Sequence, residues 1–271
     1  LASQGVVSMT RREGIAHSAS SKLHTQTGAE QAVLALGDCL DLLPTLPAKS
    51  IDLVMADMPY GTTRCAWDSH INLQRLWPEL RRISRGAILL FAQTPFDKVL
   101  GASNLPMLRY EWIWEKTHAT GHLNAKRMPM KAHENVLVFY ARLPTYNPQK
   151  TTGHVRKTAT KRGDKTAVYG DQTFDALEYD STERYPRTVQ KFASDKQRSR
   201  LHDTQKPVDF CEYLIRTYTN PGDTVLDFCM GSGTTGAACQ NTDRSFIGME
   251  LIPAIYDVAA ARLGLERRLA A

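Results

Sequence analysis

The sequence lacks any long apolar run. No stretch of its 271 residues approaches the roughly 20 consecutive apolar residues that a membrane-spanning helix needs. A signal peptide is not evident at its start either. These two absences argue against a helical membrane protein, and we expect a cytoplasmic protein that has no membrane partner.

Cysteine is scarce and its spacing is irregular. No two of the five cysteines form a C-x-x-C pair, which argues against a zinc site. Nothing suggests a disulfide framework, so we expect small buried thiols in a reducing compartment and no bound metal. The five are Cys39, Cys65, Cys211, Cys229 and Cys239.

Acidic residues are nearly absent from residues 126–165, although the formal net charge of the whole chain is only +6. Only Glu134 and Asp164 oppose the lysines and arginines there. Such an excess favours a polyanionic partner, because basic side chains displace counterions from phosphates. Residues 151–163 lack apolar periodicity and predict a flexible basic loop, for which a solvated linker is the alternative interpretation.

A short motif follows the apolar run of residues 51–56, which predicts a buried strand. The motif is Asp57-Met58-Pro59-Tyr60. Its carboxylate could accept hydrogen bonds from the exocyclic amine of a planar base, and its aromatic ring could stack on that base. Asp-x-Pro-Tyr also occurs in ordinary turns, so the interpretation depends on a second segment.

That segment is a predicted strand, residues 224–227, followed by a glycine-rich turn and a helix start. Glycines let the backbone pass close to a ligand, and a helix start favours an anionic group. Glu250 ends the next predicted strand about 20 residues on, where a ribose-binding acid belongs. The pattern indicates a nucleoside cofactor.

A dinucleotide-binding oxidoreductase is the competing interpretation, since residues 231–236 fit G-x-G-x-x-G. Two features count against it. Three residues separate Asp227 from Gly231, which is looser than a pyrophosphate turn requires, and the rest of any nucleotide-binding sheet must lie upstream.

With both segments considered, the chain resembles the amino-methyltransferases of DNA, which use S-adenosylmethionine to methylate N6 of adenine or N4 of cytosine. The catalytic motif precedes a basic region and then the cofactor loop, which resembles the circularly permuted β group. One departure is Met58, where the family usually has proline. Further similar segments are residues 36–40, 112–116, 133–139 and 202–207.

The resemblance implies an α/β fold of the Rossmann-like, S-adenosylmethionine-dependent methyltransferase type: a mostly parallel twisted sheet with helices on both faces and a permuted motif order. Periodicity predicts strands near 33–37, 51–56, 86–92, 110–115, 134–140, 224–227 and 245–250, and helices near 72–83, 95–103, 208–219, 234–241 and 253–266. We expect a loose lead-in over 1–30, a catalytic half over 31–141, a basic target-recognition insertion over 142–200 and a cofactor half over 201–271.

The resemblance also implies roles for individual residues. Asp57 and the carbonyl of Met58 or Pro59 would accept the two N–H bonds of the amine, while Tyr60 stacks on the extruded base. Asp38 would bind the cofactor adenine and Glu250 the ribose, and the glycine turn would hold the methionine part. The expected cofactor residues are Asp38, Cys39, Thr204, Lys206, Asp227, Phe228, Gly231, Ser232, Gly233, Thr234 and Glu250, and the expected DNA contacts are Lys126, Arg127, Lys131, Arg156, Lys157, Lys161 and Arg162.

The implied function is site-specific methylation of adenine N6 in double-stranded DNA. Asp rather than Ser at position 57 favours adenine, while cytosine N4 or an RNA base would keep the same fold. Met58 raises a third hypothesis, a catalytically weakened DNA-binding module, although we expect only reduced rigidity from it. A homodimer is a further expectation, because dimers are common among proteins of this resemblance.

Overall fold

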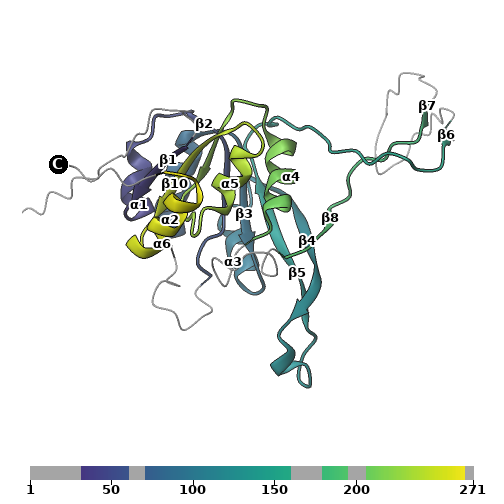
Figure 1. The fold of residues 1–271 in the computed structure, drawn as a ribbon, viewed down its shortest axis with the longest axis horizontal. Helices are drawn as coiled ribbons and strands as arrows, with labels where there is room; N and C mark the ends of the chain where they lie inside the picture. The colour runs from purple at the N-terminus through teal and green to yellow at the C-terminus, as the bar shows by residue number, and fades with distance from the viewer. Residues whose placement is uncertain (1–31, 61–70, 160–178, 195–205, 266–271) are drawn as a thin grey trace, which may run out of the picture.

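The computed structural model describes residues 32–60, 71–159, 179–194 and 206–265, and an eight-stranded sheet forms its centre (Figure 1). The order across this sheet is β1-β10-β9-β2-β3-β5-β4-β8. A separate two-stranded ribbon pairs β6 with β7. The strands are β1 (Ala32–Leu36), β2 (Ile51–Ala56), β3 (Ser84–Ala92), β4 (Leu108–Thr120), β5 (Lys131–Phe139), β6 (Lys157–Ala159), β7 (Tyr179–Ser181), β8 (Val189–Phe192), β9 (Thr224–Asp227) and β10 (Ser245–Glu250).

The expectation of a mostly parallel sheet is confirmed. β5 pairs antiparallel with both β3 and β4, whereas all other neighbours in the large sheet pair in parallel. Reversing one strand leaves β4 running in the same direction as β3. The carboxyl ends of β1, β10, β9, β2, β3 and β4 therefore meet at one edge of the sheet.

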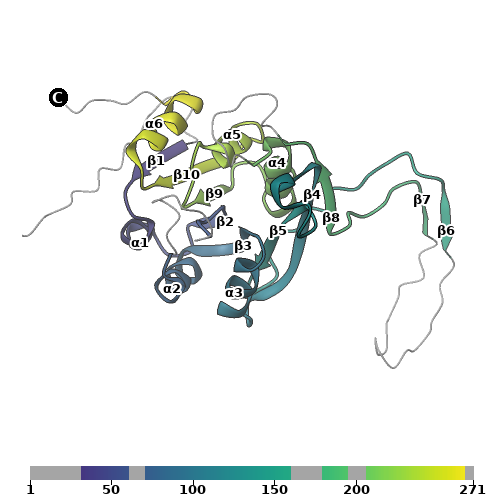
Figure 2. The same ribbon diagram turned by 90° about the horizontal axis from the view of Figure 1, so that it is seen from below.

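Both faces of the sheet are covered by helices, which explains why the central strands carry buried apolar residues on both sides (Figure 2). In β2, Leu53 and Met55 enter the core cluster beneath α4, α5 and α6, while Val54 and Ala56 enter the cluster beneath α1, α2 and α3. The helices are α1 (Cys39–Leu42), α2 (Leu73–Ile83), α3 (Phe96–Ser103), α4 (Val208–Tyr218), α5 (Thr234–Gln240) and α6 (Pro253–Arg262), with the 3-10 turns η1 (Leu43–Thr45) and η2 (His122–Asn124).

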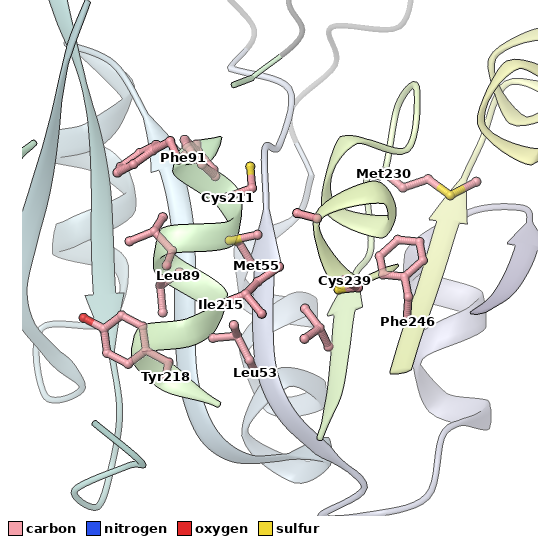
Figure 3. Packing of buried hydrophobic residues seen from close by; sticks show 14 of the residues in the cluster. Leu53, Met55, Leu89, Phe91, Cys211, Ile215, Tyr218, Met230, Cys239 and Phe246 are labelled. Atoms are coloured by element: carbon pink, nitrogen blue, oxygen red, sulfur yellow. The ribbon is translucent and has the colours of Figure 1, made fainter. Parts of the chain in front are cut away.

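Helix α4 lies across β2 and β3 and buries its apolar side against them (Figure 3). Its side chains Phe210, Leu214 and Ile215 are wholly buried there. Burying side chains of this size contributes about 1.5–3 kcal/mol each. Because α4 starts at Val208, directly after Lys206-Pro207, this packing also fixes where Lys206 can reach.

Gly86 allows β2 and β3 to approach closely where their register shifts between Ile51 and Leu53. A Cβ atom at position 86 would lie 1.8 Å from the backbone oxygen of Asp52. Only glycine can occupy this position without moving the backbone.

Several elements differ from the sequence expectations. The strands predicted at 110–115 and 134–140 extend into a longer β4–β5 hairpin that projects beyond the body of the sheet (Figure 1). Residues 151–163 were expected to be a loop, but Lys157–Ala159 forms β6. β8, which lies inside the expected 142–200 insertion, joins the main sheet as the neighbour of β4. A strand of only four residues depends on its pairing partner for its conformation.

Among the parts of the chain that the structure describes, no helix combines the length and apolarity that crossing a membrane requires.

Candidate active site

The chain reverses its direction of travel across the sheet between β9 and β2. From β9 it passes through α5 to β10 on one side, and from β2 it passes through α2 to β3 on the other. In open α/β sheets, ligands bind at this kind of switch point, outside the carboxyl ends of the strands. The motif from Asp57 to Tyr60 follows β2 and the glycine turn follows β9, so the two segments flank this point.

Asp57 is held from two sides. Tyr60 donates its hydroxyl to Asp57 Oδ1 at 2.6 Å, and the Lys206 ammonium bonds Asp57 Oδ2. Phe96, at the start of α3, stacks on Tyr60 with ring centroids 5.4 Å apart and planes 29° apart. The orientation of the Tyr60 ring is therefore set by Asp57 at its hydroxyl and by Phe96 on its face.

Lys206 also faces Glu134, with Nζ 3.2 Å from Oε2, while Lys116 pairs with the other oxygen, Oε1. The ring of Phe91 lies 5.2 Å from the Lys206 ammonium. Two ammonium groups and two carboxylates thus alternate in one chain, Asp57–Lys206–Glu134–Lys116, which we call the charge chain.

Each charged group of the charge chain favours the ionised form of its neighbour. Burial would raise the pKa of Glu134, but the positive charges of Lys206 and Lys116 outweigh burial and lower it to about 2. Burial likewise opposes the charge on Lys206, yet Asp57 and Glu134 raise its pKa above the usual lysine value. Both groups are therefore ionised at neutral pH.

The alternation of side chains along a strand explains how the two carboxylates of the charge chain reach the same face of the sheet. Asp57 follows Leu53 and Met55 at alternate positions, and Glu134 precedes Val136 and Val138 in the same way. These apolar residues face α4, so the charged residue at the end of each series faces the same side. From the sequence, Glu134 was expected only as an opposing charge in a basic region. Its spacing of two residues from Val136 was the signal that could have assigned it to the buried face of β5.

The turn after β9 forms an open cradle. Gly231 and Gly233 have φ values of +53° and +76°, a region that favours glycine. A Cβ atom added at Gly231 would meet nothing within 4 Å, so space lies above the turn. Glu250 accepts the Gly231 amide at 3.1 Å and the Ile252 amide at 2.9 Å, which ties the end of β10 to this turn.

Helix α6 supports the same turn from behind. Arg262 Nη1 donates to the Ser232 carbonyl at 3.2 Å and to the Thr234 hydroxyl at 3.0 Å. The side chains of Ser232 and Thr234 are buried. The glycine turn is therefore shaped before any ligand binds.

Asp227 lies beneath the cradle with its carboxylate buried. It accepts the Thr235 hydroxyl at 2.7 Å and the Cys229 amide at 3.0 Å. Burial raises its pKa to about 7, although both hydrogen bonds act in the opposite direction. Phe228, which follows it, is buried as well.

The turn after β1 lies beside the cradle. Asp38 accepts the Leu40 amide at 2.8 Å and caps α1, which is the ordinary structural role of such an acid. The neighbouring thiol of Cys39 is hydrogen-bonded to Cys229, and this contact, followed by burial, raises the pKa of Cys229. The expected cofactor residues near β1, β9 and β10 are thus brought together, while their cofactor contacts stay predictions.

Some expected residues lie elsewhere. Lys206 was expected beside the cofactor carboxylate, and in the structure it binds Asp57 and Glu134. Thr204, Lys161 and Arg162 fall outside the described residues. The remaining expected DNA contacts, Lys126, Arg127, Lys131, Arg156 and Lys157, are all exposed, the first three on the β4–β5 hairpin. Within the described ranges, no group of three or more His, Cys, Asp or Glu side chains could hold a metal ion.

The family profile described as "DNA methylase" matches residues 51–261, which include the motif from Asp57 to Tyr60, the charge chain and the glycine turn. The chain belongs to this family of N6/N4 DNA methylases. The methylase is 28% identical over 241 residues to the type II methyltransferase M1.MboII of Moraxella bovis, covering 79% of this chain and 89% of that one. It is 26% identical to the DNA adenine methyltransferase YhdJ of Escherichia coli, covering 91% and 87%.

Solved structures share the methylase fold. The complex of M1.HpyAVI with S-adenosylmethionine matches with a TM-score of 0.58 at 22% identity, covering 86% of this chain and all of that one (100%). The cytosine-N4-specific PvuII DNA methyltransferase matches with a TM-score of 0.62 at 17% identity, covering 89% and 88%. The Rossmann-like methyltransferase fold is therefore confirmed. The expected cofactor, S-adenosylmethionine, follows from membership of the DNA methylase family.

Proposed function

We propose that this DNA methylase transfers the methyl group to N6 of adenine and that Asp57 is its catalytic carboxylate. The position of Asp57 carries the proposal: it directly follows β2 at the switch point, and β2 pairs with β9, after which the glycine turn begins. Tyr60 places an aromatic ring next to it. Asp at this position and the similarity to a DNA adenine methyltransferase support adenine as the base.

Methyl transfer to adenine N6 requires hydrogen-bond acceptors beside the amine. The N6 lone pair of adenine is delocalised into the ring, so the free amine is a poor nucleophile. When Asp57 and the carbonyl of Met58 or Pro59 accept its two N–H bonds, the nitrogen can become tetrahedral and its lone pair is freed. The ionised carboxylate also stabilises the positive charge that develops there.

The bound cofactor supplies an electrophilic sulfonium methyl group. The protein's own contribution is alignment: the Tyr60 ring, supported by Phe96, would stack on the extruded base and hold its amine in line. Met58 does not weaken this arrangement. Its side chain is 2% exposed and belongs to the core cluster on the α2 side, so burial anchors the motif where proline would stiffen it.

Double-stranded DNA would approach the edge where the strands end. The β4–β5 hairpin extends from this edge, and all its residues from 117 to 133 are exposed. Lys126, Arg127 and Lys131 lie on it and would contact phosphates. Arg156 and Lys157, near the β6–β7 ribbon, would add contacts farther out.

The test is methyl transfer from labelled S-adenosylmethionine to mixed-sequence DNA, followed by nucleoside analysis. We expect N6-methyladenine from the wild type and none from Asp57→Ala. Asp41→Ala changes an exposed carboxylate on α1 and serves as the matched control, which should keep full activity. N4-methylcytosine would keep the mechanism and overturn the base assignment. Transfer to RNA alone would overturn the substrate.

A further inference from the structure

In the charge chain, the Lys206 ammonium is bonded to Asp57, the carboxylate that we propose acts as an anion during methyl transfer. Both oxygens of Asp57 are engaged, Oδ1 by Tyr60 and Oδ2 by Lys206. During methyl transfer the amine nitrogen becomes positive, and an ammonium group bonded to the same carboxylate opposes that charge. In the arrangement seen here, Lys206 therefore reduces the stabilisation that Asp57 can offer.

Glu134 offers Lys206 a second position. Its Oε2 atom is buried and forms an ion pair with Lys206 Nζ at 3.2 Å, but this contact lacks the geometry of a hydrogen bond. An unsatisfied buried carboxylate oxygen is costly, so a small movement of Lys206 toward it would be favourable. Lys116 holds the other oxygen of Glu134 and keeps the carboxylate charged and in place.

Lys206 would stay paired throughout such a movement. Its side chain is 10% exposed and that of Glu134 8%, so neither could leave its partner for water. The ammonium already lies within ion-pair distance of both carboxylates. Transfer between them changes which acid is neutralised without leaving a buried charge alone.

We propose that Lys206 is a latch on the catalytic carboxylate: it neutralises Asp57 until the target amine binds, and it then moves to Glu134 and leaves Asp57 free to accept from the amine. Glu134 is then a positioning residue, and Lys116 supports it. This inference rests on the proposed role of Asp57. It assigns to Glu134 a function in the chemical step that is exerted through its ion pair with Lys206.

Single-turnover methylation tests the latch. Glu134→Gln removes the charge that draws Lys206 away, so the rate should fall about 10- to 100-fold while the dissociation constant of S-adenosylmethionine changes less than about twofold. Glu134→Asp should restore part of the rate. The double variant Glu134→Gln/Lys206→Met should be faster than Glu134→Gln alone, because no cation remains on Asp57.

A purely structural role for Glu134 predicts the opposite, since removing Lys206 as well would damage the site further. A double variant no faster than Glu134→Gln overturns the latch, as does an unchanged rate for Glu134→Gln. Glu79→Gln, which breaks the partly exposed pair with Arg82 on α2, is the matched control and should leave the rate unchanged.

Thermal unfolding separates failure of the latch from failure of the proposed function. If the wild type transfers no methyl group to any nucleic acid, the role of Asp57 is wrong, but the second position of Lys206 can still be measured. Asp57→Asn should lower the melting temperature by less than half as much as Glu134→Gln, because Lys206 still has Glu134. Equal losses would show that Lys206 depends on Asp57 and would overturn the latch.

Discussion

Asp227 shows how one buried residue can set a pH dependence. Its carboxylate, at the end of β9, receives one hydroxyl and one amide and has no basic side chain among its hydrogen-bond partners. The folded-state pKa is about 7, above the ordinary value of 3.8. Between these two pKa values the folded protein keeps a proton that the unfolded chain releases. The stability that this group contributes is therefore complete below pH 3.8 and is lost as the pH rises to about 7.

We predict that Asp227→Asn removes this loss. Asparagine keeps an acceptor for Cys229 and a partner for Thr235 but does not titrate. The free energy of unfolding of the variant minus that of the wild type should increase by about 2 kcal/mol from about pH 5 to about pH 8. Urea denaturation at both pH values measures it. A difference that does not vary with pH would contradict the raised pKa.

Among the elements, the β4–β5 hairpin carries exposed positive charge at the edge of the sheet where we propose that DNA binds. We predict that Lys126→Gln/Arg127→Gln lowers DNA affinity and reduces the slope of log K against log salt by about 1 for each phosphate that these side chains no longer neutralise. Fluorescence anisotropy across a salt series measures both quantities.

The matched control is Arg81→Gln/Arg142→Gln. These exposed arginines line a cavity of about 360 Å³ at the opposite edge of the sheet, where β3 begins and β5 ends. Removing the same charge there should change the affinity little. Equal losses of affinity from the two pairs would mean that only net charge matters and that the hairpin does not contact DNA.

The elements that could be predicted from the sequence are those whose own residues show a clear apolar pattern. β2, β9 and β10 were expected over 51–56, 224–227 and 245–250 and are found there, because each is an apolar run that ends in an acid or a turn. The outer part of the hairpin and β8 were not predicted. Their residues are mostly polar, and their conformation depends on the strand beside them.

The candidate site was predictable only in part: its two motif segments could be found from the sequence, but the contacts of Lys206 could not. The order of the strands brings the Asp57 motif and the glycine turn together, so their segments were sufficient to find them. The bonds of Lys206 with Asp57 and Glu134 join three segments distant in sequence, and no local pattern specifies that contact. The position of Lys206 depends on how α4 packs across the sheet.

For the whole molecule, a cofactor that binds only the folded chain must stabilise it. We predict that S-adenosylmethionine at 100 times its dissociation constant raises the free energy of unfolding by about 2.7 kcal/mol. Glu250→Ala, which frees the Gly231 and Ile252 amides, should reduce the shift at the same concentration. NAD is the control ligand, and a shift with NAD in place of S-adenosylmethionine would favour the oxidoreductase interpretation.

The order of the strands also determines when the sheet can form during translation. β1 lies at the sheet edge and pairs with β10, which leaves the ribosome more than 200 residues later. β9, which fills the gap between β10 and β2, also emerges late. Until then the nascent chain presents β1 without a partner and one unpaired edge of β2, both open to aggregation or to chaperones. Asp57, which follows β2, can therefore take its place beside the glycine turn only after β9 and β10 have emerged.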